Sequence, residues 1–368
     1  MDDLWKGIQQ PPGPAPRLID NWDPEPWIPR REARRLDMFT QFALVATDEA
    51  FGQSGPLTAD HNRISVVLGT GIGGLQSLQR LYDHSKEDEP RPSPFSIPMM
   101  MANAAAAAIS IKYGFGGQVT TPVVACAAGS QAVIDGLRQI QWGYADAAVV
   151  GGAEAAAIRS AREGFKAARA LSPAGFARPF DVDRDGFVMG EGAAILILEA
   201  AEVAEARGAT PIAEILGAAS TADAYHVTAP HPEGEGAERA VRLALEDAAL
   251  DPSDISYVNA HGTGTELNDR TEGAVIARVF GDDQPALSSI KGATGHALGA
   301  SGSIEVAVVV EAIRRGELSP NAGLNAQDPA IALNDIVREP RQWEPGPALS
   351  NSFGFGGHNT VITISPVK

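Results

Sequence analysis

The residue with the clearest chemical potential is Cys126, the only cysteine among the 368 residues. It lies in VVACAAGSQAVIDGL, where a short β-branched run gives way to small residues and then to a helical pattern. Unpaired backbone N–H groups and the positive end of the macrodipole at a helix start favour an anion, so we predict a lowered pKa for this thiol. A lone cysteine is consistent with a nucleophile and with a small buried hydrophobic residue. Partner residues elsewhere in the chain must decide between the two.

Polar side chains interrupt three other small and apolar segments. YVNAHGTGTELND places His261 after a predicted strand, and SSIKGATGHALGASG places Lys291 and His296 five residues apart. ALSNSFGFGGHNTVI supplies a glycine-rich loop before a final strand, and neither this loop nor TGIGGL contains a phosphate-binding motif. A single histidine in such a loop is more often structural than catalytic. Two histidines together with an activated cysteine indicate thioester chemistry.

The elements that must position these residues alternate between strand and helix. We predict a helix over 31–52, a strand, glycine turn and helix over 63–84, a helix over 97–113, a strand, turn, helix and strand over 121–155, and a strand and helix from residue 186. The second half repeats this order, and KGATGHALGASGSIEVAVVVEAIRRGEL loosely repeats CAAGSQAVIDGLRQIQWGYADA. Such alternation is typical of parallel sheets. We therefore predict two related α/β halves, residues 1–207 and 208–368, with a site where their strand ends meet.

The composition limits the compartment and the partners. With 46 acidic and 29 basic residues, the net charge of -17 argues against nucleic acid as a partner. One cysteine excludes an intrachain disulfide, and no Cys/His cluster indicates zinc. The start, MDDLWKGIQQPPGPAP, has no signal-peptide pattern, and no apolar run approaches the length of a membrane span. We expect a cytoplasmic protein that binds neither nucleic acid nor membrane.

One basic cluster contrasts with this acidic background. IPRREARRLDMF groups Arg30, Arg31, Arg34 and Arg35, and helical spacing would put the last three on one face. Such a run is consistent with an ordinary solvated helix face. It is also consistent with a docking site for an acidic partner.

Four ordered motifs, ACAAGSQAV, NAHGTGT, KGATGHALGASG and NSFGFGGHN, closely resemble those of the elongating type II β-ketoacyl-[acyl carrier protein] synthases. The resemblance covers nearly the whole chain. It implies an enzyme with the thiolase fold, in which two similar halves form five α-β-α-β-α layers. It further implies an acyl carrier protein as partner, a homodimer or a heterodimer with a ketosynthase-like chain-length factor, and no cofactor, because the phosphopantetheine arm belongs to the carrier.

The resemblance also assigns roles to individual residues. Cys126 would accept an acyl group, and its N–H and that of Phe355 would form the oxyanion hole. His261 and His296 would stabilise the enolate left by decarboxylation of malonyl-carrier protein, and Lys291 and Glu305 would orient them. The carbanion would attack the acyl group and give a β-ketoacyl product two carbons longer. Other implied positions are Thr228, Thr263, Thr265, Phe165, Ile72 and Phe353 for substrate, Arg31, Arg34, Arg35, Arg91 and Arg169 for carrier docking, and Asn259, Glu305, Ser350 and Asn351 for a structural monovalent cation, with no metal required for the chemistry.

Two features depart from the family pattern. The family's first strand, of the type VVVTGxG, is missing, and we expect a gap in the centre of the first sheet unless upstream residues, a partner or altered packing fills it. His358 replaces a threonine that many relatives carry. A thiolase or an initiating synthase with Cys-His-Asn is disfavoured because HGTGT and TGH each supply a histidine. A non-condensing chain-length factor is disfavoured, because such subunits have lost the cysteine. The catalytic subunit of a heterodimer with a chain-length factor stays open, and so does the choice between fatty acid and polyketide synthesis.

Overall fold

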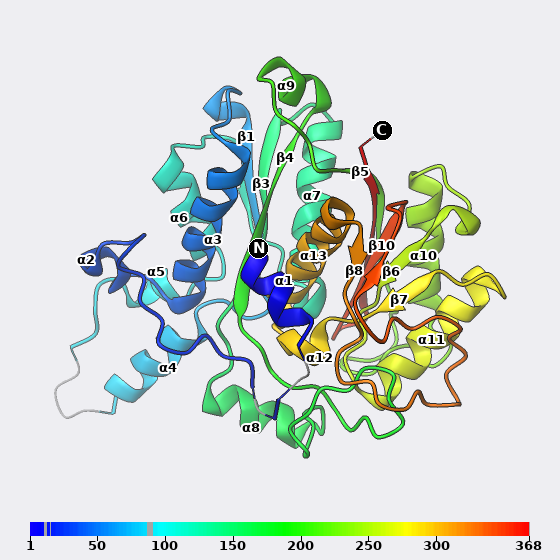
Figure 1. Ribbon diagram of the computed structural model, residues 1–368. Coiled ribbons are helices and arrows are strands. Elements are labelled where there is room, and N and C mark those ends of the chain that lie inside the picture. Colours follow the sequence, from blue (N-terminus) through cyan, green and yellow to red (C-terminus); the bar gives the residue numbers. More distant parts are fainter. Residues whose placement is uncertain (11–12, 15, 87–90, 368) are drawn as a thin grey trace.

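The computed structural model describes residues 1–10, 13–14, 16–86 and 91–367. Its longer strands form two sheets that stand side by side, and helices lie between the sheets and on the outer side of each (Figure 1). The layers follow the order α-β-α-β-α, as the family resemblance implies. The architecture is the thiolase fold.

The first sheet contains four strands in the order β2-β1-β3-β4. These are β1 (Ile64–Gly69), β2 (Val119–Thr120), β3 (Ala147–Glu154) and β4 (Gly192–Glu199). β1 and β3 are parallel and buried along their whole length, as expected for Val- and Ala-rich strands covered on both faces. Helices α3 (Met38–Ser54) and α6 (Ala104–Tyr113) cover the outer face.

The second sheet contains five strands in the order β5-β11-β10-β6-β7. These are β5 (Ala213–Ala222), β6 (Tyr257–Asn259), β7 (Ala286–Ser288), β10 (Ala348–Gly354) and β11 (His358–Pro366). Helices α10 (Glu235–Asp247) and α11 (Glu266–Phe280) lie on its outer side (Figure 1). Because the strands of the first sheet lie within 64–199 and those of the second within 213–366, the predicted boundary between 207 and 208 falls between the two sheets.

Two helices, α7 (Ala128–Gln141) and α13 (Ser301–Arg315), form the central layer and contact each other and both sheets. Only Val310, Arg314 and Arg315 of α13 are not buried, which is typical of a helix with small and apolar residues on every face. These helices are the two segments of the loose internal repeat. Their N-terminal ends follow the cysteine and the second histidine motif.

Shorter elements connect this framework. They are the helices α1 (Asp2–Ile8), α2 (Arg30–Ala33), α4 (Leu75–His84), α5 (Ser96–Met100), α8 (Arg159–Ala167), α9 (Ala201–Ala206) and α12 (Lys291–Thr294), the 3-10 turns His61–Arg63, Ala125–Ala127, Pro252–Asp254 and Leu298–Ala300, and the antiparallel pair of β8 (Glu317–Leu318) with β9 (Arg341–Gln342). Within the described ranges, no helix combines the length and apolar character needed to cross a membrane.

Two predicted helices are each divided in the structure. The prediction over 31–52 becomes α2 and α3, because Asp37 is extended and its carboxylate accepts the Phe39 N–H at 3.3 Å as the cap of α3. Arg31, Arg34 and Arg35 therefore do not share the face of one continuous helix. The prediction over 97–113 divides at Met101, whose ψ of 138° ends α5. The strand predicted just before Cys126 is wrong: residues 121–124 are irregular, and the short strand β2 ends before them at Thr120.

The predicted gap in the centre of the first sheet is wrong. β1 pairs directly with β3 from Ile64–Ala147 to Gly69–Gly152. The two sheets differ at an edge instead: in the second sheet β5 flanks β11, whereas β4, which holds the position of β11, pairs only with β3 among the described strands. Most of β4 is accordingly half-buried while most of β11 is buried. An open edge leaves one row of backbone groups facing water, which is far less costly than a central gap.

Candidate active site

Cys126 lies where the chain turns into α7. Ala125 has a φ of +50°, a left-handed conformation that alanine rarely adopts, and residues 125–127 form a 3-10 turn. Cys126 is 8% exposed, and the backbone N–H of Phe355 lies close enough to the sulfur to lower the pKa of the thiol. A Cβ at Gly354 would lie 3.1 Å from the Cys126 backbone nitrogen, so glycine permits the terminal loop to approach this closely.

The prediction of a lowered thiol pKa is wrong for the free protein. Burial raises the pKa of Cys126 to about 11, although the charge of Lys291 and the Phe355 N–H act in the opposite direction. Removal of water from around the sulfur disfavours the thiolate more than these groups stabilise it. Cys126 therefore rests as a protonated thiol at neutral pH.

His261 follows β6 in a loop that a buried carboxylate fixes. The backbone N–H groups of His261 and Gly262 each donate to one oxygen of Glu272, both at 2.8 Å. Lys291 Nζ lies 3.3 Å from His261 Nδ1 and donates to the His261 carbonyl at 2.6 Å. Because an ammonium group only donates, Nδ1 accepts and Nε2 carries the proton. Burial, Lys291 and His296 hold the pKa of His261 well below its usual value, so the ring is a neutral donor.

His296 lies between α12 and α13, and both its backbone groups are hydrogen-bonded. Its N–H donates to the Val188 carbonyl at 2.7 Å, and its carbonyl accepts the Gly190 N–H at 2.9 Å. The ring Nδ1 lies 2.9 Å from Ser301 Oγ. Burial and the charge of Lys291 hold its pKa well below the usual value. The centroids of the two histidine rings are 5.5 Å apart, so two neutral imidazoles lie side by side.

Lys291 and Glu305 form an ion pair whose two side chains are each 1% exposed. The second Glu305 oxygen accepts a hydrogen bond from Ser352 at 3.4 Å. Burial raises the pKa of Glu305 to about 7. The pair fixes the Lys291 nitrogen against His261, which in turn fixes the tautomer of that ring. The Lys291–Glu305 ion pair therefore both supports the local structure and orients the His261 ring.

An aromatic chain leads from the terminal loop to His296. Phe355 contacts Phe165 at 6.3 Å between ring centroids, Phe165 contacts Phe187 at 5.5 Å, and Phe187 contacts His296 at 5.1 Å. Phe353 lies 5.8 Å from the His261 ring. Phe353 therefore lies beside His261, whereas Phe165 and Phe355 reach His296 only through Phe187. The rings of Phe353 and Phe187 exclude water from the two imidazoles, which disfavours their charged forms.

Ile72 and His358, two other positions noted in the sequence, do not contact the histidine rings. Ile72, predicted to line the acyl pocket, is 40% exposed in the single chain and has no ring or polar contact that joins its side chain to the cluster. His358, the departure in the terminal loop, is half-buried at the start of β11. Its Nε2 would lie 3.0 Å from a Cβ at Gly356, so this ring covers the end of the GFGG turn.

The three predicted threonines come from two loops. Thr263 and Thr265 lie between β6 and α11 with their hydroxyl oxygens 3.0 Å apart, and Thr265 caps α11 by accepting the Asn268 N–H at 3.3 Å. Thr228 is exposed, and its backbone N–H donates to His226 at 3.1 Å. The Thr228 loop meets the terminal loop where the Gly356 N–H donates to the Val227 carbonyl at 2.8 Å.

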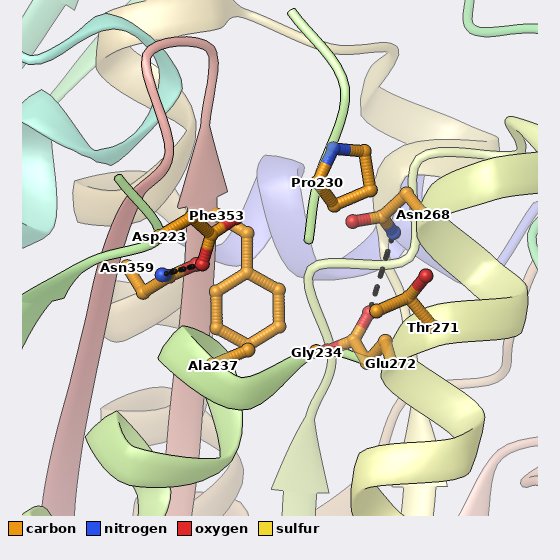
Figure 2. A pocket seen from close by; sticks show the side chains of 9 residues that line it. All are labelled: Asp223, Pro230, Gly234, Ala237, Asn268, Thr271, Glu272, Phe353 and Asn359. Carbon is orange, nitrogen blue, oxygen red and sulfur yellow. Dashed lines mark hydrogen bonds between the residues drawn. The ribbon is translucent and has the colours of Figure 1, made fainter. Parts of the chain in front are cut away.

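A small pocket lies between the 223–234 segment, α11 and the strands β10 and β11 (Figure 2). Phe353, which contacts the His261 ring, and Glu272, which holds its backbone, both line it. Figure 2 shows the Asn359 amide donating to Asp223 at 2.7 Å and the Asn268 amide donating to Glu272 at 3.4 Å. The remaining lining residues are Pro230, Gly234, Ala237 and Thr271. The first bond joins the 223–231 loop to β11, and the second lies within α11 and reaches the carboxylate that holds the His261 backbone.

The predicted docking arginines are all exposed, namely Arg31, Arg34, Arg35, Arg91 and Arg169. The Arg35 guanidinium lies 4.5 Å from the centre of the Phe95 ring, which brings the α2 segment to the loop that contains Arg91. Arg169 stands apart in the chain, after α8, with a φ of +56°. The structure therefore joins the first four arginines through one contact and places the fifth on a different element.

Three of the four residues predicted to bind a cation carry buried oxygens without a hydrogen-bond partner. These are Asn259 Oδ1, Ser350 Oγ and Asn351 Oδ1. Ser350 and Asn259 are register partners on β10 and β6, and Asn351 is the next residue. The amide nitrogens donate elsewhere, to Tyr257 and Glu272, which leaves the oxygens as acceptors. Buried oxygens without donors fit a cation with oxygen ligands.

Sequence reasoning missed three buried carboxylates that hold the catalytic loops. Glu154 accepts the N–H groups of Gly71 at 2.6 Å and Gly299 at 3.1 Å, and burial raises its pKa to about 7. Asp269 accepts the Phe180 N–H at 2.7 Å and shares the buried face of α11 with Glu272. The available signals were an acidic residue ending the apolar strand AAVVGGAE and an acidic pair three residues apart on one helix.

Comparison with known families agrees with this geometry. Residues 13–204 match the family model described as "Beta-ketoacyl synthase, N-terminal domain", and residues 212–325 match the one described as "Beta-ketoacyl synthase, C-terminal domain". The chain belongs to the β-ketoacyl synthase family. A 3-oxoacyl-[acyl-carrier-protein] synthase 2 of Synechocystis sp. (strain ATCC 27184 / PCC 6803 / Kazusa) is 43% identical over 391 residues, which cover 99% of this chain and 94% of the relative. This β-ketoacyl synthase is accordingly an acyltransferase.

Solved structures of the family share the complete fold. A β-ketoacyl synthase from Burkholderia phymatum STM815 superposes with a TM-score of 0.92 at 31% identity. The ishigamide ketosynthase/chain length factor gives 0.90 at 30% identity, and a type II polyketide ketosynthase in complex with its acyl carrier protein gives 0.89 at 29% identity. Each comparison covers 100% of this chain and 95% of the other.

The raised pKa of Cys126 predicts slow alkylation at neutral pH. The thiolate is the reactive form, so the rate with iodoacetamide should keep rising between about pH 7 and about pH 10 without a plateau. Intact-mass spectrometry measures this directly, because the chain has one cysteine and Cys126→Ala serves as the blank. A plateau below about pH 8 would show that the thiol is activated in the free protein.

Proposed function

We propose that this β-ketoacyl synthase condenses an acyl group on Cys126 with malonyl-acyl carrier protein and lengthens the acyl chain by two carbons. The observation that carries the proposal is the convergence of a buried thiol with two neutral imidazoles. Lys291 connects these groups, because it contacts His261 and its charge acts on both Cys126 and His296. The names of the relatives support the same reaction.

The first half-reaction transfers the acyl group. The Cys126 sulfur attacks the carbonyl of an acyl-carrier thioester, the new C–S bond forms, and the carrier thiolate leaves with the proton of the Cys126 thiol. The Phe355 N–H, which rests on the sulfur, lies beside the position where the oxyanion develops. A resting thiol suits this step, because the leaving carrier thiolate needs a proton.

The second half-reaction forms the carbon–carbon bond. The malonyl group loses carbon dioxide, and the electron pair of the broken C–C bond becomes an enolate whose oxygen accepts from His261 Nε2–H and from His296. Both imidazoles are neutral donors because burial suppresses their protonation. The carbanion attacks the acyl carbonyl, and the Cys126 thiolate leaves and takes up a proton. No step uses a bound cofactor.

The carrier protein brings the substrate on its phosphopantetheine arm. We assign Thr263, Thr265 and Thr228 to that arm, since their loops surround the histidine cluster and the terminal loop. The exposed arginines at 31, 34, 35, 91 and 169 supply positive charge for an acidic carrier. We assign this chemistry to the cytoplasm, because the reaction needs Cys126 as a free thiol and a reducing compartment keeps thiols in that form.

A condensation assay with purified carriers tests the proposal. The chain is incubated with acyl- and malonyl-carrier proteins of several acyl lengths, and mass spectrometry follows acyl-Cys126 and the β-keto product. Cys126→Ala should abolish both. His296→Ala should lower decarboxylation roughly a hundredfold, as expected for loss of one oxyanion donor, while Cys126 is still acylated. Absence of acylation with every carrier, or decarboxylation by His296→Ala at the wild-type rate, would refute the proposal.

The same assay separates a self-sufficient enzyme from the catalytic half of a heterodimer. β2 forms one edge of the first sheet. Val119 in β2, Val123 just after it and Ile111 on α6 are 37%, 50% and 82% exposed. We propose that a second ketosynthase-like chain covers this edge, either an identical copy or a chain-length factor. Mass measurement during the assay decides: an active homodimer supports the first, and an inactive monomer that gains activity with such a factor supports the second.

Charge reversal in the arginine cluster should weaken carrier binding without changing the chemistry. Arg34→Glu is expected to raise KM for the carrier roughly three- to tenfold at unchanged kcat, since exposed pairs each contribute little but steer association. Arg242→Glu is the matched control, because Arg242 is an exposed arginine on α10 that pairs with Glu238. Steady-state kinetics at two salt concentrations measures both variants. An unchanged KM for Arg34→Glu would remove Arg34 from the docking surface.

We also propose that Asn259, Ser350, Asn351 and Glu305 hold a structural monovalent cation. The unpartnered oxygens support it, and the cation would steady the Glu305 carboxylate that pairs with Lys291. Protein dialysed into a tetramethylammonium buffer should gain thermal stability when sodium or potassium replaces this cation at equal ionic strength. Asn259→Leu should abolish the gain. An equal Tm in all three salts would argue against the site.

A further inference from the structure

The segment that contains Lys291 and His296 is anchored from one side by an unexpected element, the chain between α1 and α2. The residues next to His296 show how. His296 uses both backbone groups to pair with residues 188–190, and Met189 and His296 are parallel bridge partners. The position of the imidazole therefore depends on what holds residues 188–191 in place.

Arg17 holds the opposite edge of residues 188–191. Its N–H donates to the Met189 carbonyl at 2.8 Å, and its carbonyl accepts the Glu191 N–H at 3.1 Å. Arg17 and Gly190 are parallel bridge partners. Since successive backbone groups of an extended chain point to opposite sides, residues 188–191 form the middle of a three-segment arrangement with Arg17 on one side and His296 on the other.

The Arg17 side chain returns to the catalytic segment directly. Its Nε donates to the Ala293 carbonyl at 2.9 Å, and its Nη2 donates to the Gly13 carbonyl at 2.6 Å. Ala293 lies in α12, which ends at Thr294, so no further helical turn supplies an N–H for this carbonyl. A Cβ at Gly295 would lie 3.1 Å from Arg17 Cγ. The Arg17 side chain thus contacts the segment just before His296, and the Arg17 backbone supports residues 188–191, which pair with His296.

We propose that Arg17 is a positioning residue for Lys291 and His296. The inference rests on the proposed function, in which these two side chains serve the decarboxylation step. The hydrogen bonds of Arg17 reach Gly13, Ala293, Met189 and Glu191, and none reaches the Cys126 turn. Loss of the guanidinium should therefore impair the histidine side of the site and spare acylation of Cys126.

The experiment compares Arg17→Met, Arg17→Lys and Arg207→Met. Arg17→Met keeps an apolar stem and removes the donors, and Arg17→Lys is a milder change that retains the charge. Arg207 is the matched control, because its guanidinium also bridges two segments, Glu199 and the Ser54 carbonyl, away from the histidines. Two readouts are needed: the separate rates of acylation and decarboxylation, and amide hydrogen exchange of residues 290–297 against 124–130.

Arg17→Met should lower kcat for decarboxylation roughly ten- to hundredfold, as a displaced catalytic group does, with Cys126 acylation within about threefold of wild type. Arg17→Lys should show the same split with a smaller loss, and Arg207→Met should show no split. Hydrogen exchange should accelerate at 290–297 and not at 124–130. If Arg17→Met does not fold, Arg17→Lys supplies both readouts.

Equal losses in acylation and decarboxylation, or unchanged exchange at 290–297, would overturn the positioning role. Failure of the proposed function looks different, because the wild-type chain itself would then not decarboxylate malonyl-carrier protein. The exchange measurement still tests Arg17 in that case. If the wild-type chain is inactive and Arg17→Met still shows faster exchange at 290–297 than wild type, the anchoring role of Arg17 is supported and only the proposed reaction is refuted.

Discussion

The site depends on how closely the N-terminal ends of α7 and α13 approach each other. A Cβ at Gly129 would lie 2.7 Å from the Ser303 nitrogen, and a Cβ at Gly302 would lie 2.8 Å from the Ser130 nitrogen. The contact is reciprocal, so each helix start needs a glycine where the other presents its backbone. Cys126 precedes one helix and His296 precedes the other. Any larger residue at these glycines would separate the two chemical groups together with the two helices.

Burial in this contact region sets the protonation states of the site. Removal of water raises the pKa of Cys126 to about 11 and lowers the pKa of both histidines. The same physical cause therefore yields a less acidic thiol and two better neutral donors. A site with charged imidazoles would repel Lys291, and a solvated site would lose the strength of its hydrogen bonds. The structure favours the donors, and the thiol loses its proton only as it reacts.

The sequence predicted that Lys291, His261 and His296 lie together, as they do in the structure, because motifs such as NAHGTGT contain a polar side chain and its glycine turn within a few residues. It predicted boundaries less well, since a single cap at Asp37 divides one helix and the break at Met101 divides another. The sequence could not predict the thiol pKa or the supporting carboxylates, because both depend on packing between distant segments. Glu154 and Gly299 are 145 residues apart, and nothing local in either segment indicates their hydrogen bond. The open edge of the first sheet likewise depends on long-range strand order, since among the described strands β5 flanks β11 and no strand flanks β4.

The two halves contribute unequally and are joined by buried carboxylates. The first half contains Cys126, and the second contains both imidazoles, Lys291 and Glu305. Glu154 of the first half accepts the Gly299 N–H of the second, and Asp269 of the second accepts the Phe180 N–H of the first. Separation of the halves would remove one hydrogen bond from each carboxylate, although Gly71 still donates to Glu154 and Gly264 to Asp269. A lost hydrogen bond to a buried carboxylate costs about 1–3 kcal/mol, so these two bonds help to hold the Cys126 turn and the histidine loops in one arrangement.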